Sequence, residues 1–362
     1  MAANQAILDA TIRHAVFLEK LKSGEVQKFA PFLKEIDRTL RERLTRTDLT
    51  DFTTKRLEAL LSDVDSLLLG IFNRYSDKLN LDLIDIANYE AQFEATNLTN
   101  AAPTSVTFDA ALPSITAIRA AILTNPLSVR GADGGKLLET FIEGFTSTER
   151  QRLTGAIRQG FFEGQTNFQI IKSIRGTKSL NYNDGILATT NRNAGAVVRT
   201  AVQHVATQAR METLKENSDV VQSVEWVSTL DSKTTAQCRT LDKRRFKLTE
   251  GPRPPIHINC RSTVVAVTDF SALFAKDATR ASVGALGGQQ VRADLSYYDW
   301  LKQQPAAFQD QAIGPVRAKL FREGGLSVER FSELQLDRNF SPLTLDQMKV
   351  LEPLAFQRAG IN

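Results

Sequence analysis

The chain has 362 residues, of which 42% are hydrophobic, and 45 basic residues against 41 acidic ones leave a formal net charge of +4. This length allows two or three packed units, and so weak a net charge does not by itself indicate a nucleic-acid-binding protein. Two cysteines are too few for a disulfide-rich secreted protein, and the apolar runs fall short of the roughly 18–20 residues of a membrane helix. The first residues mix charged and apolar positions, so we expect no signal peptide and assembly in a cytoplasm.

Long amphipathic helices are predicted in residues 1–96. Apolar side chains recur at three- and four-residue spacing in residues 4–22, from Phe29 to Leu44 and from Phe52 to Lys78. Residues 80–95 have the composition of a further helix. Because a long amphipathic helix buries one face against something, we expect this N-terminal region to dock on a partner.

A linker is predicted at residues 97–113, where Thr, Asn, Ala and Pro are concentrated. Residues 114–217 are predicted to be helical again. Within them, Thr146 and Glu149 have the spacing of a capping box, which predicts that a new helix begins at Thr146. A last long helix, from about Ile186 to Glu216, leads into the centre of the chain.

The central segment, residues 218–267, has a different pattern. Two short runs of β-branched and aromatic residues, Val224–Val227 and Thr263–Val267, enclose a stretch of turn residues and predict a small α+β module, hairpin-like and closed at its base. Residues 268–294 are rich in small residues and predict a flexible tether, and residues 295–362 predict a helical C-terminal tail. The expected fold class is therefore mainly α with a small α+β module.

The central segment also holds a close group of potential metal ligands: Asp231, Cys238, His257 and Cys260. A zinc site needs about four such ligands in tetrahedral arrangement, so the group is a candidate zinc site, and zinc is the one cofactor the sequence suggests. Two other interpretations stay open, a Cys238–Cys260 disulfide and two packed free thiols. A thiol nucleophile is not expected, because no orienting third group or oxyanion hole is recognisable.

The same segment is locally basic. From Cys238 to Arg261, with Arg261 included, there are seven basic residues against two acidic ones. A basic loop of this kind can sit on DNA phosphates, and the alternative is a solvated basic hairpin without a ligand. The candidate DNA contacts are Arg239, Lys243, Arg244, Arg245, Lys247 and Arg253.

At this module the sequence resembles the phage Mu F-like head morphogenesis proteins, the minor head proteins of tailed phages. The residues that carry the resemblance are Arg199, Thr200, Trp226, Ser228, Asp231, Thr234, Cys238, Leu241, Pro254, Pro255, His257, Asn259, Cys260 and Arg261. Similar features before and after the module, among them the tail Tyr297–Phe331, extend the resemblance over about Ser147 to Met348. Lys243, Ile258 and Ser262 depart from the family pattern, and Ser262 replaces a cysteine, which removes one thiol from any metal site.

The resemblance implies a structural protein rather than an enzyme, with a role in head morphogenesis. It implies assembly in the host cytoplasm and a place in the virion, in the head interior or at the portal vertex. The implied partners are the portal protein, the major capsid or scaffold proteins, and packaged double-stranded DNA, whose ejection the protein would influence. The tail Tyr297–Phe331 is expected to be a second docking segment because of its aromatic residues. The alternatives are a DNA-binding protein ejected with the genome and an enzyme or toxin that carries a Mu F-like module.

Overall fold

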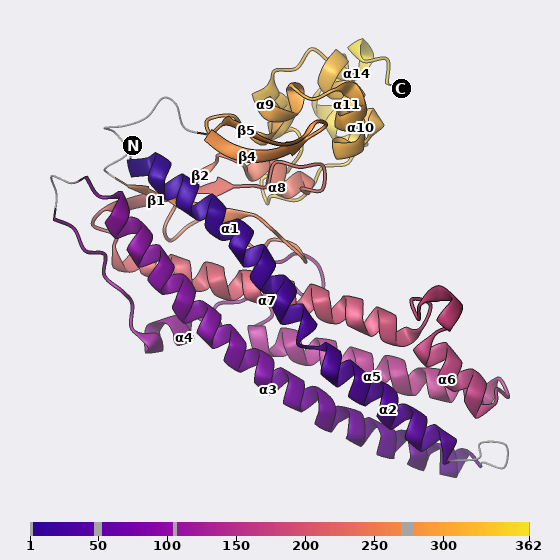
Figure 1. The fold of residues 1–362 in the computed structure, drawn as a ribbon. Coiled ribbons are helices and arrows are strands. Elements are labelled where there is room, and N and C mark those ends of the chain that lie inside the picture. The colour runs from indigo at the N-terminus through magenta and orange to yellow at the C-terminus, as the bar shows by residue number, and fades with distance from the viewer. Residues whose placement is uncertain (1–2, 47–52, 104–106, 269–278, 362) are drawn as a thin grey trace.

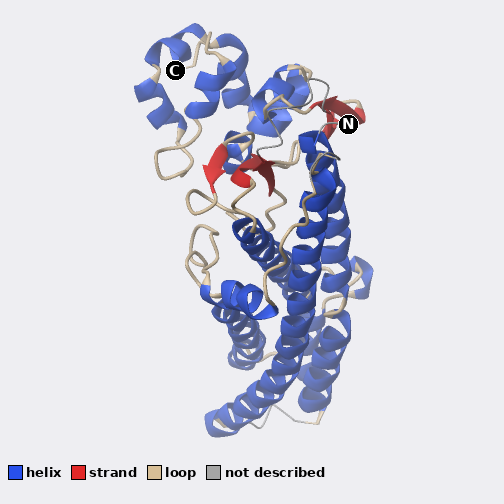
Figure 2. Ribbon diagram, turned by 90° about the vertical axis from the view of Figure 1, so that its left-hand side faces the viewer, coloured by secondary structure: helices blue, strands red, loops and turns tan. Residues whose placement is uncertain are grey.

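The computed structural model describes residues 3–46, 53–103, 107–268 and 279–361. Long helices form an elongated body, a small sheet lies at one end of it, and the C-terminal residues form a separate helical lobe beside that sheet (Figures 1 and 2). The predicted fold class, mainly α with a small α+β module, is confirmed. No described helix is long and apolar enough to cross a membrane.

The helical body is built around α3 and α7, which run along each other, with α1, α2 and α5 packed against them. The helices of the body are α1 (Ala3–Gln27), α2 (Ala30–Thr45), α3 (Thr54–Ala101), α4 (Ile115–Thr124), α5 (Leu138–Phe162), α6 (Asn167–Arg175) and α7 (Ile186–Glu216), with a 3-10 turn at Lys178–Leu180. The sequence-predicted helix Ile186–Glu216 agrees with α7 at both ends.

The apolar faces of the N-terminal helices are covered by the same chain. Phe29, just before α2, is fully buried, and its ring meets those of Tyr75 in α3 and Phe145 in α5 with centroid distances of 4.7 and 6.2 Å. Aromatic rings at such distances pack favourably edge to face. The amphipathic pattern therefore gives no reason to expect a docking partner for residues 1–96, because α5 and α7 already cover the face that the pattern predicts.

The structure differs from the predicted helix boundaries at two places. α3 continues without a break to Ala101, so the linker predicted at residues 97–113 begins inside a helix; residues 104–106 of that linker lie outside the described part. α5 runs from Leu138 to Phe162, and Thr146 lies in its middle, where its hydroxyl donates to the carbonyl of Glu143 at 3.0 Å. The predicted capping box at Thr146 is therefore wrong, because the apolar face of the helix continues through it and packs on α7.

The small sheet has the order β2-β1-β3 and is antiparallel throughout. Its strands are β1 (Val221–Val227), β2 (Arg245–Lys247) and β3 (Thr263–Thr268), and the short helix α8 (Ala236–Leu241) lies between β1 and β2 in the chain. Trp226 is paired with Val264 across β1 and β3, and both are buried. The predicted pairing of the two β-branched runs is thus confirmed, with β2 as an additional edge strand.

The predicted tether contains a β-hairpin. β4 (Thr279–Gly284) pairs with β5 (Gly287–Arg292), and the backbone N–H of Val283 donates to the carbonyl of Leu230 at 2.8 Å. The prediction of a flexible tether over residues 268–294 is therefore wrong for residues 279–292, because the hairpin is fastened to the module. Residues 269–278 lie outside the described part.

The C-terminal residues form a lobe with its own core. Its helices are α9 (Tyr297–Lys302), α10 (Ala306–Ile313), α11 (Pro315–Glu323), α12 (Val328–Glu333), α13 (Leu345–Leu351) and α14 (Pro353–Arg358). Tyr298, Phe321 and Phe331 meet at the centre, and the Phe331 ring lies 5.3 and 4.6 Å from the other two. These aromatic side chains are buried in the core of the lobe. They are therefore not the exposed anchors of a docking segment that the sequence suggested.

Candidate metal centre

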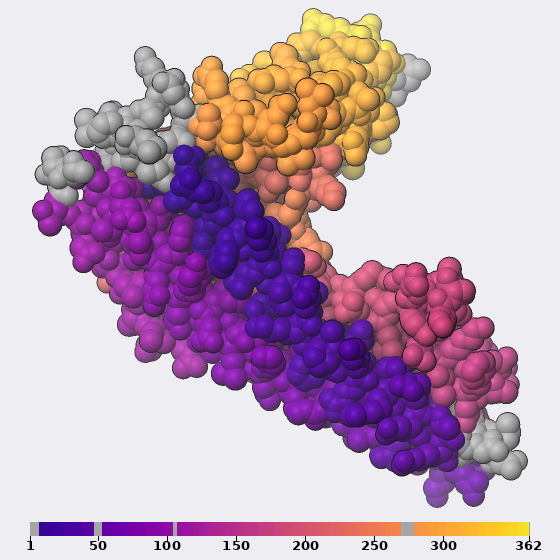
Figure 3. Space-filling model, viewed as in Figure 1, coloured from indigo at the N-terminus to yellow at the C-terminus, as the bar shows by residue number. Residues whose placement is uncertain are grey.

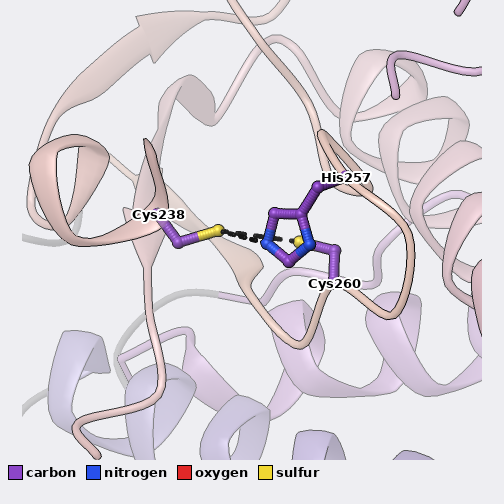
Figure 4. A group of neighbouring side chains, drawn as sticks. All are labelled: Cys238, His257 and Cys260. Atoms are coloured by element: carbon purple, nitrogen blue, oxygen red, sulfur yellow. Dashed lines mark hydrogen bonds between the residues drawn. The ribbon is translucent and has the colours of Figure 1, made fainter. Parts of the chain in front are cut away.

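Three of the four sequence-predicted metal ligands converge between α8 and the loop that precedes β3 (Figure 4). Cys238 lies in α8, which begins at its N-cap Thr235, whose hydroxyl accepts from the backbone N–H of Cys238 at 3.4 Å. His257 and Cys260 lie on the loop. This loop is fastened to α7, because the backbone N–H of Asn259 donates to the hydroxyl of Thr200 at 3.1 Å.

The ligand atoms of Cys238, His257 and Cys260 all lie within 4.8 Å of one another. Sγ of Cys238 is 3.2 Å from Nε2 of His257 and 3.8 Å from Sγ of Cys260. Nδ1 of His257 is 2.9 Å from the carbonyl oxygen of Ile258. That carbonyl can only accept, so in the neutral imidazole the proton belongs on Nδ1 and the lone pair of Nε2 faces the two thiols.

The pKa values of the two thiols are shifted in opposite directions. Both are buried, with exposed fractions of 2% for Cys238 and 0% for Cys260. Burial, followed by the contact with Cys260, raises the pKa of Cys238 well above its usual value. Burial alone would also raise the pKa of Cys260, but the hydrogen bond from Cys238 and the neighbouring His257 hold it well below its usual value. Although burial opposes it, the hydrogen bond with Cys260 and the charge of Cys260 raise the pKa of His257, so the group favours a Cys260 thiolate beside His257.

The structure does not bring Asp231 into this group. Its carboxylate accepts two hydrogen bonds from the guanidinium of Arg261, at 2.7 and 3.0 Å, and a third from Thr234 at 3.0 Å. Although burial opposes it, these hydrogen bonds from Arg261 and Thr234 lower the pKa of Asp231, so the carboxylate stays ionised in an ion pair. The disulfide interpretation does not describe this structure either, because both cysteines are free and a disulfide has sulfurs at about 2.05 Å.

A buried lysine that the sequence analysis did not single out lies close to the group. Lys22 of α1 is 1% exposed, and its ammonium donates to Oε1 of Glu19 and to Oε1 of Gln203, both at 2.5 Å. Gln203 in turn donates to the carbonyl of Ser262 at 3.1 Å. Burial lowers the pKa of Lys22, while the charges of Glu19 and Cys260 oppose that shift. No sequence signal marks Lys22, because more than 200 residues separate it from the thiols.

The six candidate DNA contacts do not form one surface. Arg239 is buried and donates to the carbonyl of Ala312, with its guanidinium 5.5 Å from the ring centroid of Tyr297. Lys243 and Arg245 both pair with Glu225. Arg239 is therefore engaged inside the protein, and Lys243 and Arg245 each have an acidic partner.

The remaining candidates differ in exposure. Arg244 and Arg253 are half-buried, and Arg253 donates to the carbonyl of Lys247 at 2.5 Å. The side chains of Arg245 and Lys247 are 61% and 74% exposed. These two are the ones that a DNA backbone could reach without rearrangement.

Taken together, the fold and the Cys/His group define a helix-rich protein with a small sheet beside a buried cluster of two thiols and an imidazole. Residues 151–265 match the family model described as "Phage Mu protein F like protein". The match begins in α5, ends in β3 and includes Cys238, His257 and Cys260. The resemblance is thus confirmed over residues 151–265, which form a phage Mu F-like segment of the chain.

This family points to a bacteriophage head morphogenesis protein. No curated protein and no solved structure match the chain.

Proposed function

We propose that this protein is a minor head protein of a tailed bacteriophage, built into the virion during head morphogenesis. The observation that carries the proposal is the family match over residues 151–265, because it covers α6, α7, β1, β2 and the first half of β3. The other long helices pack on α7, so the matched segment is the centre of the body rather than an appended module.

A structural role is supported by the burial of the reactive groups. A thiol enzyme must present its nucleophile to a substrate, together with a base and an oxyanion hole. Cys238 and Cys260 are enclosed by the module and α7, with at most 2% of either residue exposed. We therefore propose an assembly protein rather than an enzyme or toxin.

The portal protein is the partner we propose, with the protein at the portal vertex or in the head interior. Since the apolar helix faces are covered internally, a partner must be met through exposed side chains. Val350, Leu351 and Leu354 form one such group on α13 and α14, with exposed fractions of 81, 53 and 64%. Exposed apolar groups of this kind favour protein contact. Capsid or scaffold proteins are the competing partners.

Contact with packaged DNA is proposed only through Arg245 and Lys247. Both lie near acidic residues, Glu225 and Glu250, at 3.2 and 3.3 Å. Two cations with acidic neighbours release few counterions, so binding to DNA should be weak. The binding constant should fall with at most about the second power of the salt concentration. An Arg245→Ala, Lys247→Ala variant with an unchanged salt dependence would remove this part of the proposal.

Co-expression with the portal protein of the same phage tests the main proposal. The full chain should co-purify with the tagged portal protein, and it should be found by mass spectrometry in purified heads. Val350→Asp with Leu354→Asp should weaken the portal complex, whereas Leu81→Asp, on α3 and 65% exposed, is the matched control. A chain absent from purified heads would contradict the role in the virion, and a complex formed only with the capsid protein would move the contact away from the portal.

A further inference from the structure

The thiol–imidazole group of Cys238, His257 and Cys260 has the geometry of a tetrahedral metal site. Two sulfurs bound at ~2.3 Å to one tetrahedral Zn²⁺ lie about 3.8 Å apart. The Sγ atoms of Cys238 and Cys260 are separated by 3.8 Å. A sulfur and an imidazole nitrogen on the same ion lie about 3.6 Å apart, and the separation from Cys238 to Nε2 of His257 is 3.2 Å, a difference that a small turn of the ring removes.

The surroundings of His257 have the form expected of a metal ligand. Metal-bound imidazoles usually donate their second N–H to a carbonyl or carboxylate, which fixes the ring and the tautomer. Nδ1 of His257 lies 2.9 Å from the carbonyl of Ile258, so Nε2 is held toward the sulfurs. Figure 4 shows the ring beside both sulfurs, with Cys238 coming from α8 and the other two residues from the loop.

The charge balance and the ligand types select zinc. Two thiolates cancel the charge of a divalent ion, so the complex adds no net charge to a site where both sulfurs are buried. Two thiolates and an imidazole are ligands that zinc prefers, whereas Mg²⁺ and Ca²⁺ prefer oxygen. Among the described residues, this is the one group of three or more potential ligands that converges in this way.

We propose that Cys238, His257 and Cys260 bind one structural Zn²⁺, with a fourth, non-thiolate ligand on the side of Ser262. The hydroxyl of Ser262 is buried next to Cys238 and is hydrogen-bonded to its thiol. The fourth ligand is this hydroxyl or a water molecule held by it. The proposal is independent of the role in the phage head.

The zinc ion would join two parts of the module that the sheet alone does not join. It links α8 to the loop before β3, and that loop is fastened to α7 through Thr200. α8 also carries Arg239, which donates to Ala312 of the C-terminal lobe. Metal binding would therefore hold the lobe to the helical body as well as stabilise the module.

The first test uses the unaltered full chain, purified under reducing conditions without chelator. Elemental analysis should find one zinc ion per chain. Titration with a mercurial reagent should release it in step with the modification of two thiols, and a cobalt-substituted sample should show the visible bands of tetrahedral, thiolate-bound Co²⁺. A purified chain that contains no zinc and gives no such cobalt spectrum overturns the proposal.

Variants test the ligand set, and circular dichroism checks that each one folds. Cys260→Ser and His257→Ala should each lower zinc affinity by more than about 100-fold, beyond the usual loss for outer partners of a metal site. Asp231→Asn should bind zinc with wild-type affinity, because Asp231 pairs with Arg261. Ser262→Cys should bind zinc more tightly, as a third thiolate completes the tetrahedron. Loss of zinc in Asp231→Asn, or its retention in folded Cys260→Ser, would overturn the assignment.

Discussion

Arg280 of β4 and Asp242 at the end of α8 form an ion pair that is almost fully enclosed, with side-chain exposures of 1% and 0%. Two hydrogen bonds of 2.9 and 3.1 Å join the guanidinium to the carboxylate. The same guanidinium donates to the carbonyl of Ser228, whose N–H donates to Asp242. This network fastens the β4–β5 hairpin to the module across a stretch of chain that the composition predicts to be flexible.

We expect Arg280→Met to destabilise the protein by about 3–5 kcal/mol, since it leaves the Asp242 carboxylate buried without its cation. Chemical denaturation measures the loss. Arg292→Met on β5 is the matched control, because its side chain is 71% exposed and its ion pair with Asp294 contributes at most about 1 kcal/mol. Equal losses in the two variants would show that the hairpin is not held by this network.

A second buried network ties α7 to α3 and the sheet. Arg210 pairs with Glu94 at 3.0 Å and with Glu90 at 3.3 Å, and it also donates to Thr263 of β3. Arg210→Met should cost about 3–5 kcal/mol, because two carboxylates lose their cation in the interior.

The comparison for Arg210 is Arg158→Met, which breaks a surface pair with Glu58 of the same kind at 2.8 Å, with both side chains about half exposed. That change should cost at most about 1 kcal/mol. Adding Glu94→Gln to Arg210→Met should recover part of the loss, and thermal unfolding of the three variants checks both expectations.

His204 of α7 gives a specific dependence of stability on pH. Burial lowers its pKa from 6.5 to about 4, and hydrogen bonds to the backbone of Ile122 and Asn125 offset only part of this shift. The folded state therefore keeps His204 neutral at pH values where the unfolded chain binds a proton. Its contribution to stability is complete above pH 6.5 and is lost as the pH falls toward 4.

His204→Gln should accordingly flatten the dependence of the free energy of unfolding on pH between 6.5 and 5, by up to about 1.4 kcal/mol per pH unit. Denaturation at several pH values measures the two slopes. Above pH 7 the curves should run parallel, since His204 is then neutral in both states. Identical slopes between pH 6.5 and 5 would show that His204 titrates normally in the folded protein.

Thr146 and Glu149 distinguish a helix start from a continuous helix. If Thr146 were an N-cap, Thr146→Ala would lower the free energy of unfolding by about 1 kcal/mol. Inside α5, the same substitution should change it by no more than about 0.5 kcal/mol. Glu149 is 1% exposed and accepts from Thr190 at 2.7 Å and Asn193 at 2.6 Å. Glu149→Ala should therefore cost about 1–3 kcal/mol, because it leaves buried donors without an acceptor. A larger loss of stability in Thr146→Ala than in Glu149→Ala would show that Thr146 is an N-cap after all.

Local patterns in the sequence were sufficient for most of the secondary structure. The three- and four-residue spacing of apolar residues predicts α1, α2 and the first half of α3, and the two β-branched runs predict the pairing of β1 with β3. The same patterns failed where a helix continues through a polar stretch, as at Asn97 and Thr146. Both side chains are buried there, and their surroundings come from α1 and α7 rather than from adjacent residues.

The sequence by itself also determined that two thiols and an imidazole lie in one short segment, because the motif spacing brings them within reach of one another. Only the tertiary structure decided that Asp231 forms an ion pair with Arg261, that Arg239 donates to the carbonyl of Ala312, and that Lys22 lies near Cys260. The physical reason is range. Helix and strand patterns are set by neighbours a few residues away. The partner of a buried charge, in contrast, is set by the packing of distant segments, and the high free energy of an unpaired buried charge stabilises that pairing.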